Sequence, residues 1–368
     1  MRILQISSAQ SLGGGERHLA DLANGLADRG HEVHVALRAK SPLIRELQSV
    51  PGQNIHTLPL RNALDAKSAR DLARLVKQHE IQIVHAHMAR DYPPAAYAAR
   101  RNATARLIIT RHVLFAMNRL HRITLSGAAR VIAVSQAVST QLKADAICDA
   151  GKISVVLNGI DVARFQKARA KFDRKKFLDE WELNEENQLV GIIGELTPLK
   201  GQEEFLRAAA LVAQQLPNAR FIVAGIDHSS GKKYQGQLRR LLAELNLGER
   251  VKFGGWVDDL ARLYCGLDVL VSASHTESFG LVLAEAMASG TAVVATSTAG
   301  ASELVTMNQT GLIVPVGEVE QLAAGVLRLL VDKKLTAKLA ANAQNVAAEK
   351  FTVARMISET ENIYAGVL

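Results

Sequence analysis

The hydrophobic positions of this chain alternate between short continuous runs and helical stripes. Residues 2–6 and 32–37 are apolar runs rich in β-branched residues, which is typical of buried strands. Residues 16–30, between them, repeat apolar side chains every three or four positions and end at Gly30, which indicates an amphipathic helix and its stop signal. Further runs in the first half predict strands at 54–60, 81–87, 106–112, 130–135 and 153–158. Strands that alternate with helices predict a parallel sheet covered on both faces.

The alternation stops once, at the charged residues 163–188, and then starts again. This stretch holds few strand-forming residues, so we interpret it as the connection between two domains. The second half predicts strands at 188–196, 220–225, 251–256, 268–274, 292–298 and 311–316, and helices from about residue 318 onward. Because ligands bind at the carboxyl ends of the strands in such sheets, we expect the active site in the cleft between the domains.

The composition is typical of a globular chain, and its excess positive charge lies in the first half. Apolar residues make up 48% of the sequence, and the net charge is +8. Residues 1–170 hold 24 Lys and Arg against 12 Asp and Glu, whereas the remaining residues hold 20 against 24. This imbalance suggests that the first domain meets an anionic partner, and a bias toward solubility is the alternative. Aromatic residues are only 4% of the chain, so nucleic-acid binding is not expected.

The apolar runs and the cysteines favour a cytoplasmic location. No run reaches the ~18–20 residues of a membrane span, and the first ten residues, MRILQISSAQ, have too short an apolar core for a signal peptide. Cys148 and Cys265 lie far apart in sequence, outside any metal-binding pattern, which favours a reducing compartment. A cytoplasmic protein of this kind can also contact the anionic inner face of the plasma membrane peripherally, and the sequence leaves this alternative open.

Three glycines, Gly13, Gly14 and Gly15, follow the first strand and precede the first helix. The backbone N–H groups of such a loop approach a phosphate closely, and the helix N-terminus adds a favourable partial charge. The dinucleotide fingerprint is not met, because His18 stands at the third glycine position. The loop therefore predicts a phosphate or pyrophosphate site, and a tight turn is the alternative.

Two carboxylates flank an apolar stretch, HTESFGLVLAEAM, at 275–287. Gly280 is expected to begin a helix whose free amide groups suit a pyrophosphate. Glu277 precedes this helix and Glu285 lies in its second turn; eight helical residues rise ~12 Å, beyond the ~5–9.5 Å that separates glycosidase acid pairs. The pair suits a nucleotide-sugar, with one acid for each ring, and Lys200 can reach the phosphates between them. The alternatives are that Glu277 is a surface loop acid, that Glu285 is a capping acid near a helix start, and that Lys200 is only solvated.

The histidines are concentrated in the first half of the chain. His85 and His87 lie in one predicted strand, where we expect only one of them to point into the crevice and the other to pack. His112, at the carboxyl end of a strand, is well placed for the cleft. No spacing of histidines, acids or cysteines indicates zinc, so no metal site is predicted.

A set of short motifs occurs in the order and spacing of a known enzyme family. The motifs are GGGE (13–16), ADRGHEVHV (27–35), VHAH (84–87), ITRH (109–112), VLNGID (156–161), GELTPLKG (194–201), ESFGLVLAEAMASG (277–290) and TGLIVPVG (310–317). In them the chain resembles the retaining glycosyltransferases of family 4, over nearly its whole length. The resemblance implies an α/β protein with the GT-B fold, in which two doubly wound Rossmann-like domains with parallel sheets face a central cleft. It implies an acceptor domain at 1–165, a nucleotide-sugar domain at 166–347, and a helix in 348–368 that crosses back to the first domain.

The resemblance also implies roles for individual residues. Catalytic roles fall to His112 beside the transferred sugar, Glu277 on its hydroxyls and Lys200 on the diphosphate, while Glu285 holds the ribose. The other donor-binding residues that it implies are Gly14, Gly15, Phe279, Gly280, Leu281, Trp256 and Val257, with the last two near the base.

Glu195 departs from the family pattern, which often has an arginine there to partner the diphosphate. A carboxylate repels phosphate at close range. We therefore expect either that Glu195 points elsewhere while Lys232 or Lys233 compensates, or that the donor binds more weakly.

The resemblance implies a hexosyltransferase that works with retention and without a metal ion. Its donor is a nucleotide-diphosphate sugar, which is a co-substrate, and no cofactor is expected. The acceptor is expected to be an anionic or lipid-linked saccharide of the cell envelope, contacted by Arg90, Arg111 and Arg119 of the basic half. A nucleotide-sugar epimerase or a sugar phosphorylase on the same fold is the alternative.

Overall fold

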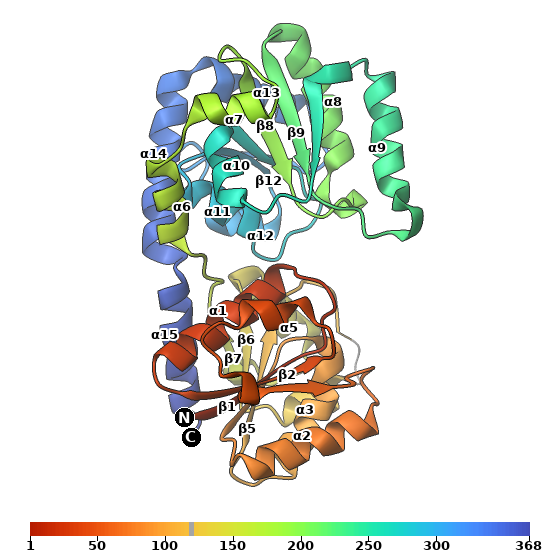
Figure 1. Ribbon diagram of the computed structural model, residues 1–368, viewed down its shortest axis with the longest axis vertical. Helices are drawn as coiled ribbons and strands as arrows, with labels where there is room; N and C mark the ends of the chain where they lie inside the picture. The colour runs from red at the N-terminus through yellow and green to blue at the C-terminus, as the bar shows by residue number, and fades with distance from the viewer. Residues whose placement is uncertain (118–120) are drawn as a thin grey trace. The chain divides into compact units, whose positions relative to one another are not determined.

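The protein folds into two α/β units in a computed structural model that describes residues 1–117 and 121–368 (Figure 1). The first unit comprises 1–159 and 353–368, and the second comprises 160–352. The sequence had indicated divisions at 165/166 and 347/348. The first division lies earlier in the structure because α6 (Val162–Ala170) packs on α10 (Leu260–Gly266) of the second unit, with the rings of Phe165 and Tyr264 6.0 Å apart.

The first unit contains a seven-stranded parallel sheet in the order β3-β2-β1-β4-β5-β6-β7. Its strands are β1 (Arg2–Ser7), β2 (Glu32–Arg38), β3 (Ile55–Leu58), β4 (Ile83–Ala86), β5 (Arg106–Arg111), β6 (Arg130–Ala133) and β7 (Ile153–Val155). Its described helices are α1 (Gly14–Asp28), α2 (Ala66–Gln78), α3 (Tyr92–Arg100), α4 (His121–Ser126), α5 (Gln136–Asp145) and α15 (Val353–Ala365).

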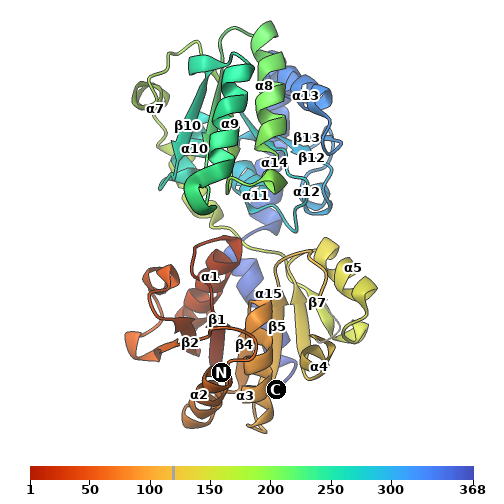
Figure 2. The same cartoon turned by 90° about the vertical axis from the view of Figure 1, so that its right-hand side faces the viewer.

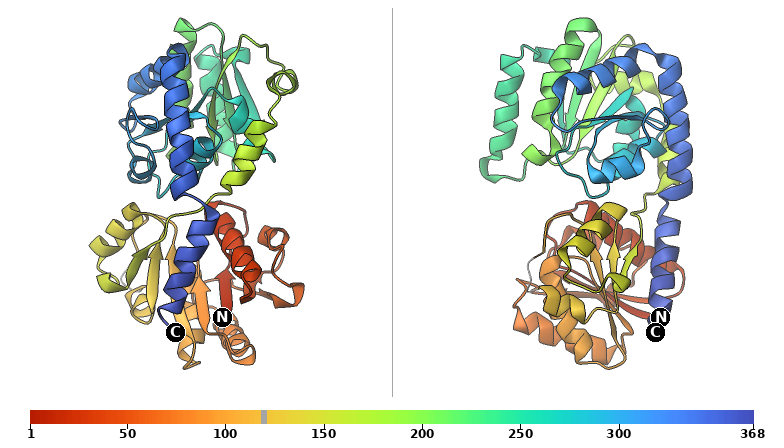
Figure 3. Two further views of the ribbon diagram at one scale, coloured as in Figure 1. Left: turned by 90° about the vertical axis from the view of Figure 1, so that its left-hand side faces the viewer. Right: turned by 180° about the vertical axis from the view of Figure 1, so that it is seen from behind.

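Successive strand residues of this sheet point to opposite helical layers. Leu4 and Ile6 pack toward α2, α3 and α5, whereas Ile3 packs toward α1 and α15. Figure 3 shows α15 lying beside α1. Gly25 makes this close contact possible, because a Cβ atom there would lie 2.0 Å from Cδ1 of Ile357. The end of the chain is thus part of the core of the first unit.

The second unit contains a six-stranded parallel sheet in the order β10-β9-β8-β11-β12-β13. The strands are β8 (Gln188–Ile193), β9 (Ala219–Ala224), β10 (Val251–Gly255), β11 (Val269–Ser272), β12 (Ala292–Thr296) and β13 (Leu312–Val314). The helices besides α6 and α10 are α7 (Arg174–Glu180), α8 (Gln202–Gln215), α9 (Lys233–Glu244), α11 (Leu281–Ala288), α12 (Ala299–Leu304), α13 (Val319–Val331) and α14 (Lys333–Lys350). The layer with α8 and α9 faces the viewer in Figure 2, and together with α13 it covers one side of the sheet.

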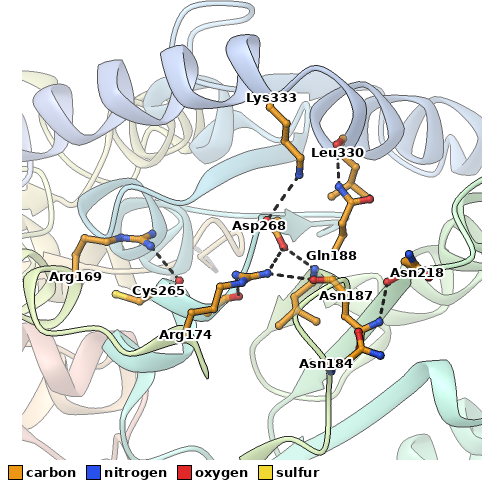
Figure 4. Close-up of polar contacts among 12 residues, drawn as sticks. Arg169, Arg174, Asn184, Asn187, Gln188, Asn218, Cys265, Asp268, Leu330 and Lys333 are labelled. Carbon is orange, nitrogen blue, oxygen red and sulfur yellow. Dashed lines mark hydrogen bonds and ion pairs between the residues drawn. The ribbon is translucent and has the colours of Figure 1, made fainter. Parts of the chain in front are cut away.

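The interpretation of 163–188 as a connecting segment is wrong. Most of this stretch forms α6 and α7, which are anchored to the second unit by two arginines (Figure 4). Arg169 donates to the carbonyl of Cys265 at 3.0 Å, and Arg174 pairs with the Asp268 carboxylate at 3.2 Å. The charges that suggested a solvated linker instead hold these helices in place.

Each sheet has one point at which neighbouring strands are distant in the chain. In the first unit β1 lies beside β4, and in the second β8 lies beside β11. Ligands of doubly wound sheets bind outside the carboxyl ends of the strands at such switch points. The loops that follow these strands, 8–13, 87–91, 194–201 and 273–280, contain many of the predicted site residues.

Candidate active site

In the second unit, the loops that follow β8 and β11 are held side by side. The His275 N–H donates to the Leu199 carbonyl at 2.9 Å. Gly201 has a φ of +70°, and a Cβ atom on it would lie 2.0 Å from the Ala273 carbonyl oxygen, so a residue with a side chain does not fit there. The glycine after Lys200 therefore permits the close approach that fixes both loops.

This approach brings Lys200 and Glu277 together as an ion pair. The Lys200 Nζ atom lies 2.7 Å from Oε2 of Glu277, and their side chains are 33% and 16% exposed. Both charges are thus partly buried yet open to solvent on one side. The alternatives of a solvated lysine and a surface loop acid are wrong for these residues, and the sequence reasoning had missed that they are partners.

The residues that follow Glu277 form a fixed turn into α11. Gly280 is the N-cap with a φ of +100°, which favours glycine, and Phe279 is buried edge-to-face against Phe351 with ring centroids 5.7 Å apart. The Gly300 N–H donates to the Glu277 carbonyl at 3.0 Å, and a Cβ atom on Gly300 would lie 2.7 Å from that oxygen. The first amide groups of α11, beginning with Leu281, lack partners within the helix and are suited to bind an anion.

Glu285 lies in the second turn of α11, as predicted, and it is buried. Its side chain accepts a hydrogen bond of 2.7 Å from the Tyr264 hydroxyl, and Tyr264 is itself fully buried. A buried carboxylate requires such donors, because leaving it without them costs several kcal/mol. Glu285 is therefore not a surface capping acid. Tyr264 was missed because nothing in its local sequence distinguishes it from a core residue.

The other residues predicted for the second unit are less closely grouped. Trp256 is exposed and donates from its indole N–H to Asp258 at 2.7 Å; it and Val257 follow β10, which β9 separates from β8. Glu195 is exposed, and its backbone carbonyl accepts a hydrogen bond from the Gln202 side chain at 2.9 Å. Lys232 and Lys233 are exposed at the start of α9.

In the first unit, the glycine loop leads directly into α1. Gly13 is the N-cap, and its N–H donates to the Glu16 carboxylate at 3.0 Å. Gly14 and Gly15 form the first turn, and a Cβ atom on Gly15 would lie 3.5 Å from Cγ of His112. The structure thus places the predicted glycine loop and His112 next to each other.

His112 is half-buried and belongs to a group of four histidines, of which His18, His85 and His87 are buried. The His112 Nε2 atom lies 3.3 Å from Nδ1 of His87, and the ring centroids of His18 and His112 are 4.8 Å apart. The rings of His85 and His87 are 4.2 Å apart, and fully buried His85 contacts the hydroxyls of Tyr364 and Thr110 within the first unit. Residues two positions apart in a strand share a face, and that places both rings together.

These histidines are neutral at pH 7. Burial lowers the pKa of His18 to about 4, although its Nδ1 contact of 2.9 Å with the Asn158 side chain opposes this shift. Burial also holds the pKa values of His85, His87 and His112 well below their usual range, with a further lowering by the neighbouring rings.

Asp91, which the sequence reasoning missed, holds the loop after β1. Its carboxylate accepts from the Ser8 N–H at 2.8 Å, and burial raises its pKa to about 6. The sequence could have indicated Asp91, because it is an acid that follows shortly after β4, one of the two strands at the switch point.

The predicted acceptor arginines differ in their exposure. Arg90 is exposed. Arg111 is buried and donates to the Phe115 carbonyl, so its predicted role as an open contact for an anion is wrong. Arg119 lies outside the described residues. Among the residues that the structure describes, no helix has the length and hydropathy that crossing a membrane requires.

Similar solved structures define the class of the fold. A glycosyltransferase from Rickettsia africae superimposes with a TM-score of 0.88 at 23% identity, over 100% of this chain and 98% of the other. Alr3699/HepE of Anabaena, solved in complex with UDP and glucose, gives a TM-score of 0.85 at 26% identity, over 99% of both chains. These likenesses and the two Rossmann-like units confirm the predicted GT-B fold.

The sequence comparisons identify the family. Residues 12–164 match the model of Glycosyltransferase Family 4, and residues 173–346 match that of Glycosyl transferases group 1. A D-inositol 3-phosphate glycosyltransferase of Mycobacterium ulcerans is 30% identical over 86% of this chain and 74% of its own length. The N-acetyl-alpha-D-glucosaminyl L-malate synthase of Bacillus anthracis is 26% identical over 99% and 96%. The chain belongs to glycosyltransferase family 4, which favours a glycosyltransferase over the epimerase or phosphorylase alternative.

Proposed function

We propose that this enzyme transfers a sugar from a nucleotide-diphosphate sugar to an anionic acceptor, with retention and without a metal ion. The observation that carries the proposal is the Lys200–Glu277 ion pair at the N-terminus of α11, at the switch point of the second sheet. The similar HepE protein was solved with UDP and with UDP-glucose, which supports a donor of this class.

The second unit supplies groups for each part of such a donor. Glu285, oriented by Tyr264, is suited to accept hydrogen bonds from ribose hydroxyls. The first amide groups of α11 are suited to the diphosphate. Glu277 is suited to the hydroxyls of the transferred sugar, and Lys200 both orients this carboxylate and offers its charge to the phosphates. The proposed contacts of Gly14, Gly15 and His112 with the donor, and of Trp256 and Val257 with its base, stay predictions.

The difficult step is the departure of the diphosphate. The bond between the anomeric carbon and the phosphate oxygen breaks, the acceptor hydroxyl forms its bond on the same face, and the departing phosphate takes the hydroxyl proton. Lys200 and the α11 amide groups stabilise the negative charge as it develops. Glu195 adds no positive charge at the position where the family often has an arginine, so we propose that the donor binds more weakly than in relatives with that arginine.

The acceptor is proposed to be anionic because the first half of the chain carries 24 basic against 12 acidic residues. The names of two relatives specify L-malate and D-inositol 3-phosphate, which are both anionic. A lipid-linked saccharide of the cell envelope, which the enzyme would reach by peripheral contact with the membrane, is a further anionic acceptor of the proposed class. Cys148 and Cys265 are both free thiols, which supports a reducing, cytoplasmic location.

A thermal-shift panel of nucleotides and nucleotide-sugars tests the donor. The matching nucleoside diphosphate should raise the unfolding temperature, because a ligand that binds only the folded state stabilises it. Transfer assays with that donor then compare phosphorylated polyols, hydroxy acids and lipid-linked saccharides, and NMR of the product gives the anomeric configuration. An inverted product would contradict the proposed mechanism, and so would loss of turnover on addition of a chelator that leaves the unfolding temperature unchanged.

A further inference from the structure

A second group of histidines lies away from the candidate active site, and no step of the transfer uses it. His34 lies in β2, His56 in the edge strand β3, and His79 directly after α2; we call these residues the three-histidine cluster. His34 and His79 lie toward the amino ends of the strands, because His34 is near the start of β2 and α2 ends just before β4 begins. The glycine loop and His112 lie at the opposite, carboxyl edge.

The nitrogen atoms of the three-histidine cluster converge. The Nδ1 atom of His34 lies 3.0 Å from Nε2 of His56, and one ring nitrogen from each of the three residues lies within 4.8 Å of the others. The ring of His79 has its centroid 4.3 Å from that of His34 and 5.4 Å from that of His56. Two nitrogens bound to one tetrahedral zinc ion, each at ~2.0–2.1 Å, are about 3.4 Å apart. Small side-chain shifts therefore suffice to bring all three onto one ion.

A carboxylate fixes the orientation of the central ring. The Nε2 atom of His34 lies 3.0 Å from Oε1 of Glu32, so Nε2–H donates to this acid and Nδ1 carries the lone pair. The lone pair then points toward His56. A carboxylate that holds the outer nitrogen of a metal-binding histidine is the usual arrangement in zinc sites.

We propose that His34, His56 and His79 bind a divalent transition-metal ion, with Zn²⁺ as the expected metal and water at the fourth position. Imidazole ligands favour this class of ion over Mg²⁺ or Ca²⁺. In the metal-free protein His56 donates its Nε2–H to Nδ1 of His34. On binding, Nε2 becomes the ligand and the His56 proton moves to Nδ1, so no net proton is released by this ring.

The site is accessible from solvent and joins three separate elements. His34 is buried, whereas His56 and His79 are half-buried, which leaves one side of the cluster open for entry of the ion. The ion would connect β2, the short edge strand β3 and the end of α2. Because the cluster lies at the amino edge of the sheet, the ion has a structural role and takes no part in the transfer.

Calorimetric titration of ZnCl₂ into the full chain, with a competing chelator, tests this site. The wild-type protein should bind Zn²⁺, and His56→Gln and His79→Gln should each weaken binding by about 100-fold or more. Glu32→Gln should weaken it by about 10–100-fold, as expected when the partner of a ligand is removed. His228→Gln, which removes an exposed histidine of the second unit, is the matched control and should leave the affinity unchanged.

Hydrogen exchange of the wild-type protein gives a second readout that needs no variant. Zinc should slow exchange in β3 and at the end of α2, while the loop 8–13 stays unchanged. Absence of zinc binding, or unchanged affinity in both His56→Gln and His79→Gln, would overturn the proposal. It is equally overturned if His18→Asn removes the zinc, because the ion then belongs to the group of His18, His87 and His112.

Discussion

The two units share one architecture but differ in how they hold polar groups at the switch point. In the first unit, half-buried His112 lies beside Gly15 and belongs to a group of neutral imidazoles. In the second, charged Lys200 and Glu277 form a partly exposed ion pair. The same fold thus supports two kinds of site, because its loops rather than its sheet carry the chemistry.

This difference has a physical cause. An ion pair that is open on one side can exchange its partner for a charged ligand at little cost, so the second unit is suited to a diphosphate. The imidazoles of the first unit are kept uncharged by burial, and their ring nitrogens contact one another and neighbouring polar side chains, so they form a fixed and neutral surrounding for the glycine loop. The variants below test each half of this comparison, from the largest expected effect to the smallest.

Glu277→Gln should lower turnover by about 100–1,000-fold, because it removes the carboxylate proposed to contact the transferred sugar. Binding of the bare nucleoside diphosphate should be equal or tighter, since Lys200 loses its partner and is free for the phosphates. Lys200→Ala should instead weaken both ligands. Steady-state kinetics together with calorimetry separate the two patterns, and near-normal turnover of Glu277→Gln would remove its assigned role.

Acid should destabilise the first unit before the second. The unfolded chain takes up protons on histidine below a pKa of 6.5, whereas folded His18 does so only near 4. The free energy of unfolding therefore falls as the pH drops from about 6.5 to about 4, by on the order of 3 kcal/mol for His18 alone. Asp91 has the opposite effect, because its raised pKa of about 6 lets the folded protein take up this proton before the unfolded chain does.

Hydrogen exchange in β1, β4 and β5 measures this effect in the first unit. Both tryptophans, Trp181 and Trp256, lie in the second unit, so their fluorescence follows that unit separately. His18→Gln should flatten the pH dependence of the first unit, while His228→Gln should not. Equal acid sensitivity of the two units would contradict the comparison.

Arg169→Ala should destabilise the second unit by about 2–3 kcal/mol. The guanidinium donates to the carbonyls of Cys265, Ser289 and Gly290, near the ends of α10 and α11, and their loss leaves partly buried acceptors without a donor. Urea unfolding followed by tryptophan fluorescence measures the change. Lys167→Ala, an exposed change on the same helix, should have no effect, and a similar loss in both variants would exclude a specific anchor.

Tyr264→Phe should weaken nucleotide binding about 10-fold, because Glu285 loses the hydroxyl that orients it. The loss should be the same for the nucleoside diphosphate and for the complete donor, in contrast to Glu277→Gln. Calorimetry with both ligands provides the measurement. A loss confined to the complete donor would place Glu285 on the sugar instead of the ribose.

Glu195→Arg should strengthen binding of the nucleoside diphosphate a few-fold, since a cation then replaces an acid at the position where the family often has an arginine. The effect should fade at high salt, because the side chain is exposed. Glu195→Gln is the control for removal of the negative charge alone. If neither variant changes affinity, Glu195 lies too far from the diphosphate to matter.

The sequence by itself determined the fold class and pointed to the loops that form the candidate site. Strand–helix alternation is a local property, so it predicted most of the strands of both sheets. Gly13–Gly15 and Gly280 marked two helix starts, and Gly280 has the positive φ that favours glycine, whereas Gly13 is extended. Glu277 and Glu285 stood out because acids are unusual in an apolar stretch.

Tertiary structure alone decided which of these groups act together. Lys200 and Glu277 are 77 residues apart, and His18 and Asn158 are 140 apart, so no local pattern relates them. Arg111 is buried, although the sequence did not distinguish it from the exposed arginines. The charged stretch around Arg169, which we expected to be a linker, forms helices that hydrogen bonds hold to the second unit. Contacts across the sheet and the depth of a side chain depend on how the whole chain packs, and the order of residues does not show them.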